Sequence, residues 1–226
     1  MLKKPSYVLL LLSASLSLAA FAWSTPRTTT AVPRAVIESH AAAAPIRLTV
    51  APSGNVARYR VREQLVGRDL PNDAVGETSK VSGAIVIDES GKIVREESRI
   101  VVDVTALKSD SDRRDGYVQR RLLEGEQHPM VTFVPTEVHG LSGALPTSGT
   151  ANLHLVGDLT VKGVTRPTAW QVTARFNGQQ ITGSASTAFT FDDFNLTQPR
   201  VPVLLSVADT IRLEYDFTLV REGETE

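Results

Sequence analysis

The sequence predicts an all-β domain of about eight antiparallel strands with one short helix near residues 112–123. Three observations carry this prediction. From residue 46 onward, apolar and polar side chains alternate in successive runs, which is typical of strands that bury one face. Turn sequences separate the runs, and one segment replaces the alternation with a helical spacing. This pattern fits either an up-and-down barrel or a sandwich.

The first 22 residues have the organisation of a signal peptide. Lys3 and Lys4 precede an uncharged run from Tyr7 to Ala22, and Ala20-Phe21-Ala22 has the small-x-small pattern that a signal peptidase accepts. We therefore expect residues 1–22 to be cleaved and the protein to be exported, to the periplasm or the exterior. The alternative is an uncleaved N-terminal membrane anchor, because about 16 apolar residues approach the shortest segment that spans a bilayer.

The rest of the chain divides into three parts. Residues 23–45 have no sustained apolar period and bury too little to offset the entropy of ordering, so we expect a flexible linker. Residues 46–221 form the predicted β-domain, and residues 222–226 form a short tail.

Eight runs show the alternation that predicts strands. Glu89-Ser90-Gly91-Lys92 and Asn177-Gly178 supply turns between them, the latter because both residues tolerate positive φ. The predicted strands are Arg58–Val66, Lys80–Asp88, Ser98–Leu107, Met130–Val138, His154–Val161, Ala169–Phe176, Gln180–Phe191 and Ile211–Leu219.

The predicted helix lies between the third and fourth of these runs. Asp110 or Asp112 is a suitable N-cap, and Pro129 follows its end. Arginines seven residues apart stack on one helical face, so Arg114 and Arg121 could hold an anionic group there. The alternative is that these arginines pair with the acidic residues around them.

Composition and motifs exclude several classes of function. The chain has 24 basic and 25 acidic side chains, which is too balanced for a protein that neutralises nucleic-acid phosphates. It has no cysteine, and no two of its four histidines have the spacing of a metal pair. No motif pairs a nucleophile with a base. We therefore expect no catalytic residues, no metal, no cofactor and no nucleic-acid partner.

Three blocks of sequence resemble the YceI family of exported lipid-binding proteins. The most specific is Gly157–Pro167, which is similar almost residue for residue to the family pattern GdLTikGvTrp. The others are Arg114–Leu123 with His128–Phe133, and Val81–Asp88 with Ile100–Leu107. The resemblance covers about residues 79–220. It implies an extended, lipocalin-like antiparallel barrel that holds a long apolar chain, a polyisoprenoid such as a quinone tail or prenyl phosphate being the usual expectation.

The inward phase of the strands gives candidate wall residues for such a barrel. The chain has 7 phenylalanines, 4 tyrosines and 2 tryptophans. Because large aromatic side chains would be needed to fill the interior, this small number favours an apolar cavity over a filled barrel. The candidates are Ile85, Ile87, Ile100, Val102, Val104, Phe133, Leu155, Leu159, Trp170, Val172, Phe189, Phe191, Leu213, Tyr215 and Phe217. The candidate head-group contacts are Arg114, Arg121 and His128. Residues 65–76 look like an insertion that adds a loop at the barrel mouth.

Two functions follow from these observations. The first is an exported, non-catalytic protein that sequesters or transports a polyisoprenoid or similar amphiphilic lipid, with transient membrane contact. The alternative is an envelope stress-response or protein-interaction module on a filled barrel, which would show an exposed apolar patch instead of a deep pocket. The sequence sets no oligomeric state.

Overall fold

The computed structural model of the chain describes residues 44–141 and 143–222. The predicted signal peptide, most of the predicted linker and the end of the predicted tail lie outside these residues. The strands are β1 (Ile46–Val50), β2 (Val56–Leu65), β3 (Asn72–Thr78), β4 (Val81–Ile87), β5 (Arg99–Asp103), β6 (Lys108–Ser109), β7 (Met130–His139), β8 (Ser148–Val161), β9 (Val164–Asn177), β10 (Gln180–Thr190) and β11 (Leu204–Arg221). The helical segments are η1 (Arg95–Glu97), η2 (Val104–Ala106), α1 (Asp112–Tyr117), η3 (Val118–Leu122) and η4 (Asp192–Phe194).

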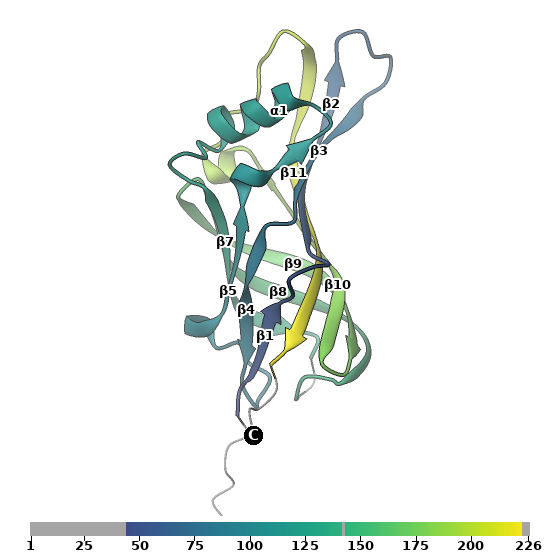
Figure 1. Ribbon diagram of the computed structural model, residues 1–226. Coiled ribbons are helices and arrows are strands. Elements are labelled where there is room, and N and C mark those ends of the chain that lie inside the picture. Colours follow the sequence, from purple (N-terminus) through teal and green to yellow (C-terminus); the bar gives the residue numbers. More distant parts are fainter. Residues whose placement is uncertain (1–43, 142, 223–226) are drawn as a thin grey trace, which may run out of the picture. The chain divides into compact units, whose positions relative to one another are not determined.

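Eight of the strands close into an antiparallel barrel. Their order is β1-β4-β5-β7-β8-β9-β10-β11, and the pairing of β11 with β1 completes the ring (Figure 1). Closure sets Leu48 opposite Arg221. The predicted all-β fold with about eight strands and one short helix is confirmed. The continuous ring decides for the barrel against the sandwich.

The longest strand, β11, holds a second set of strands to the barrel. Its C-terminal end pairs with β1, whereas its earlier residues pair with β2, from Leu204 opposite Leu65 to Asp216 opposite Val56. β3 pairs with β2, and β6 pairs with β3. These strands therefore extend one side of the barrel wall beyond β1, and α1 lies at this end, beside β2 and β3 (Figure 1).

Strand β9 shows how alternating burial builds the barrel interior. In β9 the side chains of Trp170, Val172, Ala174 and Phe176 are buried, and the residues between them are exposed. The neighbouring strand β10 approaches β9 closely at Gly183, where a Cβ would lie 2.0 Å from the carbonyl oxygen of Thr173. Glycine is therefore required at this position for the two strands to pair without displacement.

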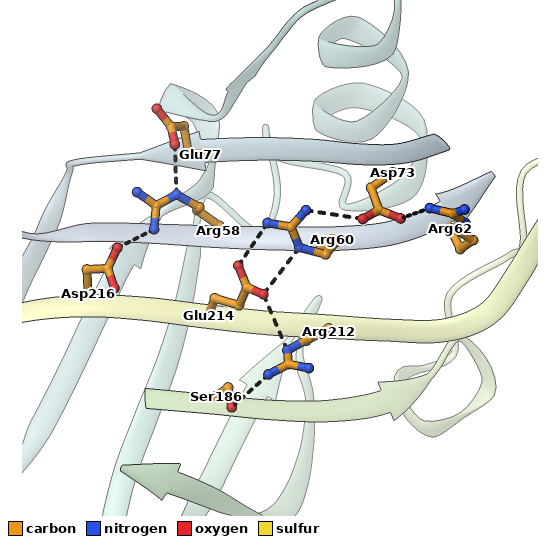
Figure 2. A network of polar contacts seen from close by, with 9 residues as sticks. All are labelled: Arg58, Arg60, Arg62, Asp73, Glu77, Ser186, Arg212, Glu214 and Asp216. Carbon is orange, nitrogen blue, oxygen red and sulfur yellow. Dashed lines mark hydrogen bonds and ion pairs between the residues drawn. The ribbon is translucent and has the colours of Figure 1, made fainter. Parts of the chain in front are cut away.

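The outward-facing side chains of β2, β3 and β11 form a network of ion pairs, shown in Figure 2. Arg58 lies between Glu77 and Asp216, with 2.8 Å from its Nε to the Glu77 carboxylate. Arg60 pairs with Asp73 and with Glu214. Because the polar residues of these strands satisfy one another on the outside, the other face of each strand is left for the interior. The drawn residues are Arg58, Arg60, Arg62, Asp73, Glu77, Ser186, Arg212, Glu214 and Asp216.

Several local predictions differ from the structure. The N-cap of α1 is Ser111, whose hydroxyl accepts from the backbone N–H of Arg114, and not Asp110 or Asp112. The predicted helix continues from α1 into a π-helical turn, η3, which ends at Leu122. Strand β5 ends at Asp103, so Val104 begins η2 instead of extending the strand.

Two hairpins explain the strongest sequence signals. The block Gly157–Pro167 is the β8–β9 hairpin, in which Lys162 and Gly163 have φ values of 48° and 74° and join Val161 to Val164. The predicted turn at Asn177-Gly178 is present one residue further on, because Asn177 still pairs with Gln180. Gly178, with φ of 60°, therefore supplies the left-handed conformation of this turn.

Candidate ligand cavity

The barrel encloses a cavity of about 990 Å³. All eight strands of the ring contribute to its wall, together with β2, β3, α1, η3 and the segment before β11. Sites for small molecules usually have about 300–1,000 Å³, so this cavity is at the upper end of the range. The wall is predominantly apolar, and its polar residues include Glu63, Arg68, Asp110 and Arg114.

Two aromatic residues of the wall, Trp170 and Tyr215, have their polar atoms satisfied within the protein. The indole N–H of Trp170 donates to the hydroxyl of Thr168 at 3.2 Å. The hydroxyl of Tyr215 donates to the Asn55 side chain at 2.7 Å, and burial raises the pKa of Tyr215. The Trp170 ring also packs against Phe133, with 5.6 Å between ring centroids. These rings therefore supply apolar surface without an unmet hydrogen-bonding need.

The structure places every predicted wall residue on this one cavity. Strand phase selected them, and the barrel brings them together from β4, β5, β7, β8, β9, β10 and β11 and from the turns at Val104 and Phe191. They are Ile85, Ile87, Ile100, Val102, Val104, Phe133, Leu155, Leu159, Trp170, Val172, Phe189, Phe191, Leu213, Tyr215 and Phe217.

The candidate head-group residues are not brought together. Arg114 lines the cavity, but Arg121 and His128 do not. Arg121 is exposed on η3. In a continuous α-helix, residues seven apart share one face, but the π-helical turn of η3 changes this spacing and turns Arg121 away from Arg114. The imidazole of His128 packs beside Gly163, where a Cβ would lie 3.2 Å from its Cε1.

Arg114 instead takes part in an ion pair at the end of the cavity where α1 lies. Its guanidinium is 2.7 Å from the carboxylate of Glu63 on β2, and it also bonds to Asp110. The two central side chains are nearly buried, with 17% of Arg114 and 9% of Glu63 exposed. Burial lowers the pKa of Arg114, but the charges of Glu63 and Asp110 outweigh it, so its pKa is raised and the cation is held.

Glu63 is the residue of this site that sequence reasoning missed. The signal was present, because Tyr59, Val61, Glu63 and Leu65 occupy the inward phase of β2 and all of them line the cavity. A charge at the inward phase of a strand needs a partner that neutralises it. That partner lies 51 residues away, so its identity depended on the fold.

Within residues 44–141 and 143–222, no group of three or more acidic residues, histidines or cysteines is arranged to hold a metal ion. In the same part of the chain, no helix has both the length and the apolar character needed to cross a bilayer. The candidate binding site is the cavity, with the Glu63–Arg114 ion pair at one end.

Comparisons with known proteins agree with this architecture. The solved structure of a polyisoprenoid binding domain from Saccharophagus degradans, implicated in plant cell wall breakdown, superposes with a TM-score of 0.57 at 11% identity and covers 77% of this chain and 98% of that one. BcnA from Burkholderia cenocepacia superposes with a TM-score of 0.53 at 17% identity, covering 75% of this chain and 98% of that one. At these identities the likeness shows the fold. No match was found among curated protein sequences.

The family model of the YceI-like domain matches residues 49–219, which span nearly the whole barrel from β1 to β11. The match confirms the resemblance carried by the Gly157–Pro167 block and the segments around it. The chain belongs to the YceI-like domain family.

Proposed function

We propose that this protein is an exported, non-catalytic carrier that sequesters a polyisoprenoid or a similar long-chain lipid inside its barrel. The observation that carries the proposal is the cavity of about 990 Å³, whose wall is predominantly apolar. A neighbour in structure is named as a polyisoprenoid binding domain, which supports the same class of ligand. The predicted signal peptide supports export.

Tail burial is expected to supply most of the affinity. Each CH₂ removed from water contributes about 0.8 kcal/mol, so a tail of about 15 carbons contributes on the order of 10 kcal/mol before ordering costs. One hydrogen bond to a head group adds about 0.5–1.5 kcal/mol. The wall residues therefore set the strength of binding, and the residues at the cavity end with Glu63 and Arg114 set selectivity.

The second candidate is an envelope stress-response or protein-interaction module on a filled barrel, and the cavity argues against it. Protein interiors are close-packed, with few voids larger than a water molecule. A volume of 990 Å³ bounded by leucine, isoleucine and valine would leave many wall atoms without contacts. A bound apolar chain would supply those contacts, whereas the filled-barrel alternative provides nothing that occupies the cavity.

The test uses two alanines of β10 that face opposite ways. Ala185 is buried and lines the cavity, whereas Ala188 is exposed. Ala185→Phe is expected to shorten the space for a tail and to weaken isoprenoid binding at least tenfold, and Ala188→Phe is expected to leave it unchanged. Trp170, in the cavity wall, reports binding through its fluorescence. Equal affinities in the two variants would refute a tail in this cavity.

Native mass spectrometry of the protein purified from its own host completes the test. An added mass that solvent extraction identifies as an isoprenoid supports the carrier proposal and gives the tail length. A protein without added mass that also fails to bind quinone or prenyl phosphate would favour the interaction module. The same spectrum gives the mass of the mature chain, so cleavage after residue 22 is tested at once.

A further inference from the structure

Two adjacent loops project from the cavity end that carries α1. One is the turn of the β2–β3 hairpin, residues 66–71, and the other is residues 199–205, the segment before β11 with the first two residues of that strand. The backbone N–H of Val66 donates to the carbonyl of Val203 at 3.0 Å, and Leu65 lies opposite Leu204. In Figure 1 the two loops stand side by side at the top of the view.

These loops expose an unusual share of apolar surface. Six large apolar side chains are strongly exposed in the described part of the chain, and four of them are in the two loops. The remaining two, Met130 and Val220, are 45% and 38% exposed and lie elsewhere. We call the four the tip patch: Val66 (57% exposed), Leu70 (77%), Val203 (48%) and Leu205 (64%).

The tip patch is continuous with the cavity wall. Val66 and Val203 are exposed to solvent and also line the cavity, as do Leu65, Pro202 and Leu204 beside them. An apolar chain that leaves a membrane loses about 0.8 kcal/mol per CH₂ if it crosses water. A wall that continues from the barrel interior to exposed tips would keep such a chain in apolar contact throughout the transfer.

The charges around the patch favour an anionic surface. Arg68 and Arg200 lie in the two loops, and Arg113 lies on the nearby α1. Within the described part of the chain, none of these three arginines forms an ion pair. Asp69 is the one acidic residue in the two loops. Free guanidinium groups next to exposed apolar side chains suit a bilayer, since the arginines reach phosphate groups while the apolar side chains enter the acyl region.

We infer that the tip patch docks onto the surface of a lipid bilayer containing anionic phospholipids and that the cavity exchanges its lipid there. The exchange step rests on the proposed function, but the docking step stands on the exposed side chains and the arginines. The docked face is therefore a second functional surface, which shares Val66 and Val203 with the cavity wall and continues that wall outward.

Vesicle co-sedimentation tests the docking step with the protein free of added isoprenoid. The vesicles contain phosphatidylcholine and phosphatidylglycerol in equal amounts. The variant Val66→Ser/Leu70→Ser/Val203→Ser/Leu205→Ser is expected to lose at least about tenfold in partitioning. The control Met130→Ser/Val220→Ser changes the same kind of exposed side chain elsewhere and should keep the wild-type value. Equal partitioning of wild type and tip variant would overturn the proposal.

Further variants separate the charge from the apolar contribution. Arg68→Gln/Arg200→Gln is expected to lose about fivefold per arginine on these vesicles and nothing on vesicles of pure phosphatidylcholine. The single substitution Leu70→Ser keeps the test valid if the quadruple variant folds poorly, because Leu70 is the most exposed of the four. If wild type forms a dimer in vesicle-free sedimentation and the tip variant does not, the patch is a contact between copies and the bilayer proposal fails.

A soluble ligand distinguishes failure of docking from failure of the proposed function. Farnesol binding is followed without vesicles through Trp170 fluorescence in wild type and in the tip variant. Binding of farnesol by both proteins, with vesicle binding by neither, would overturn docking and leave the carrier proposal intact. Vesicle binding without farnesol binding would uphold docking and refute the isoprenoid cavity.

Discussion

The ion pair between Glu63 and Arg114 is expected to hold α1 on the end of the barrel, and its removal to be costly. The substitution Glu63→Gln keeps the size of the side chain and one acceptor oxygen but leaves the charge of Arg114 with a single partner. That partner, Asp110, has 80% of its side chain exposed. The guanidinium of Arg114 would then be nearly buried and poorly neutralised.

The size of the effect follows from burial. Removing one partner of a buried ion pair costs about 3–5 kcal/mol, because the other charge remains away from water. Arg114 is 17% exposed and keeps Asp110, so the lower limit, about 3 kcal/mol, applies. In a domain of this size each kcal/mol shifts Tm by about 2–4 °C, which gives a decrease of about 6–12 °C.

Urea and thermal unfolding of a double-mutant cycle measure this coupling. Replacing both residues, as in Glu63→Met/Arg114→Met, leaves no buried charge and should cost less than Glu63→Gln alone. The matched control is Glu77→Gln. Arg58, which like Glu63 is on β2, lies between the carboxylates of Glu77 and Asp216, but Glu77 is 55% exposed. The control should lose less than about 1 kcal/mol. A Glu63→Gln loss as small as that of the control would refute the reasoning.

Three further predictions concern the wall. Tyr59→Phe removes a buried hydroxyl that has no partner, so the free energy of unfolding should stay unchanged or rise by about 1 kcal/mol. Tyr215→Phe breaks the hydrogen bond to Asn55 and should lower the free energy of unfolding by about 1 kcal/mol. Urea unfolding measures both variants. Gly183→Ala places a Cβ against the carbonyl of Thr173 and should cost about 1–3 kcal/mol in the same assay. Burial raises the pKa of Tyr59 to about 12 and also raises that of Tyr215. Because the neutral phenol is favoured in the folded state, this stability is present below pH 10.0 and is lost as pH rises toward 12, which phenolate absorbance and unfolding measurements follow together.

Much of the cavity wall could be predicted because alternate side chains of a strand point to opposite faces, so only one of two sets can face the interior. The alternation from Ile211 to Leu219 is nearly pure, and choosing the apolar face there places Leu213, Tyr215 and Phe217 in the interior. The same reasoning along β9 selects Trp170 and Val172. Their contact with a ligand stays a prediction that the Ala185→Phe variant tests.

The residues at the cavity end could not be predicted in the same way, because their positions depend on local backbone geometry and distant partners. One π-helical turn after Tyr117 is enough to turn Arg121 away from Arg114. Glu63 acquires its partner from a helix that follows four intervening strands. Residues 65–76, predicted to be an added loop, instead form the turn of the β2–β3 hairpin and most of β3. The pairing of this hairpin with the start of β11 gave no signal in the sequence.

The split pairing of β11 has a consequence for biosynthesis. This last strand supplies the edge partners of β1, β2 and β10, so all three have an open edge until it is made. Contacts between Leu48 and Arg221 close a loop of nearly the whole domain, which is slow because the entropy of closure precedes the gain in contacts. A nascent chain therefore has no enclosed interior, and it exposes strand edges on which other chains can aggregate. Any ligand of the cavity must therefore enter after synthesis, and a chaperone that shields these edges would raise the yield of closed barrels.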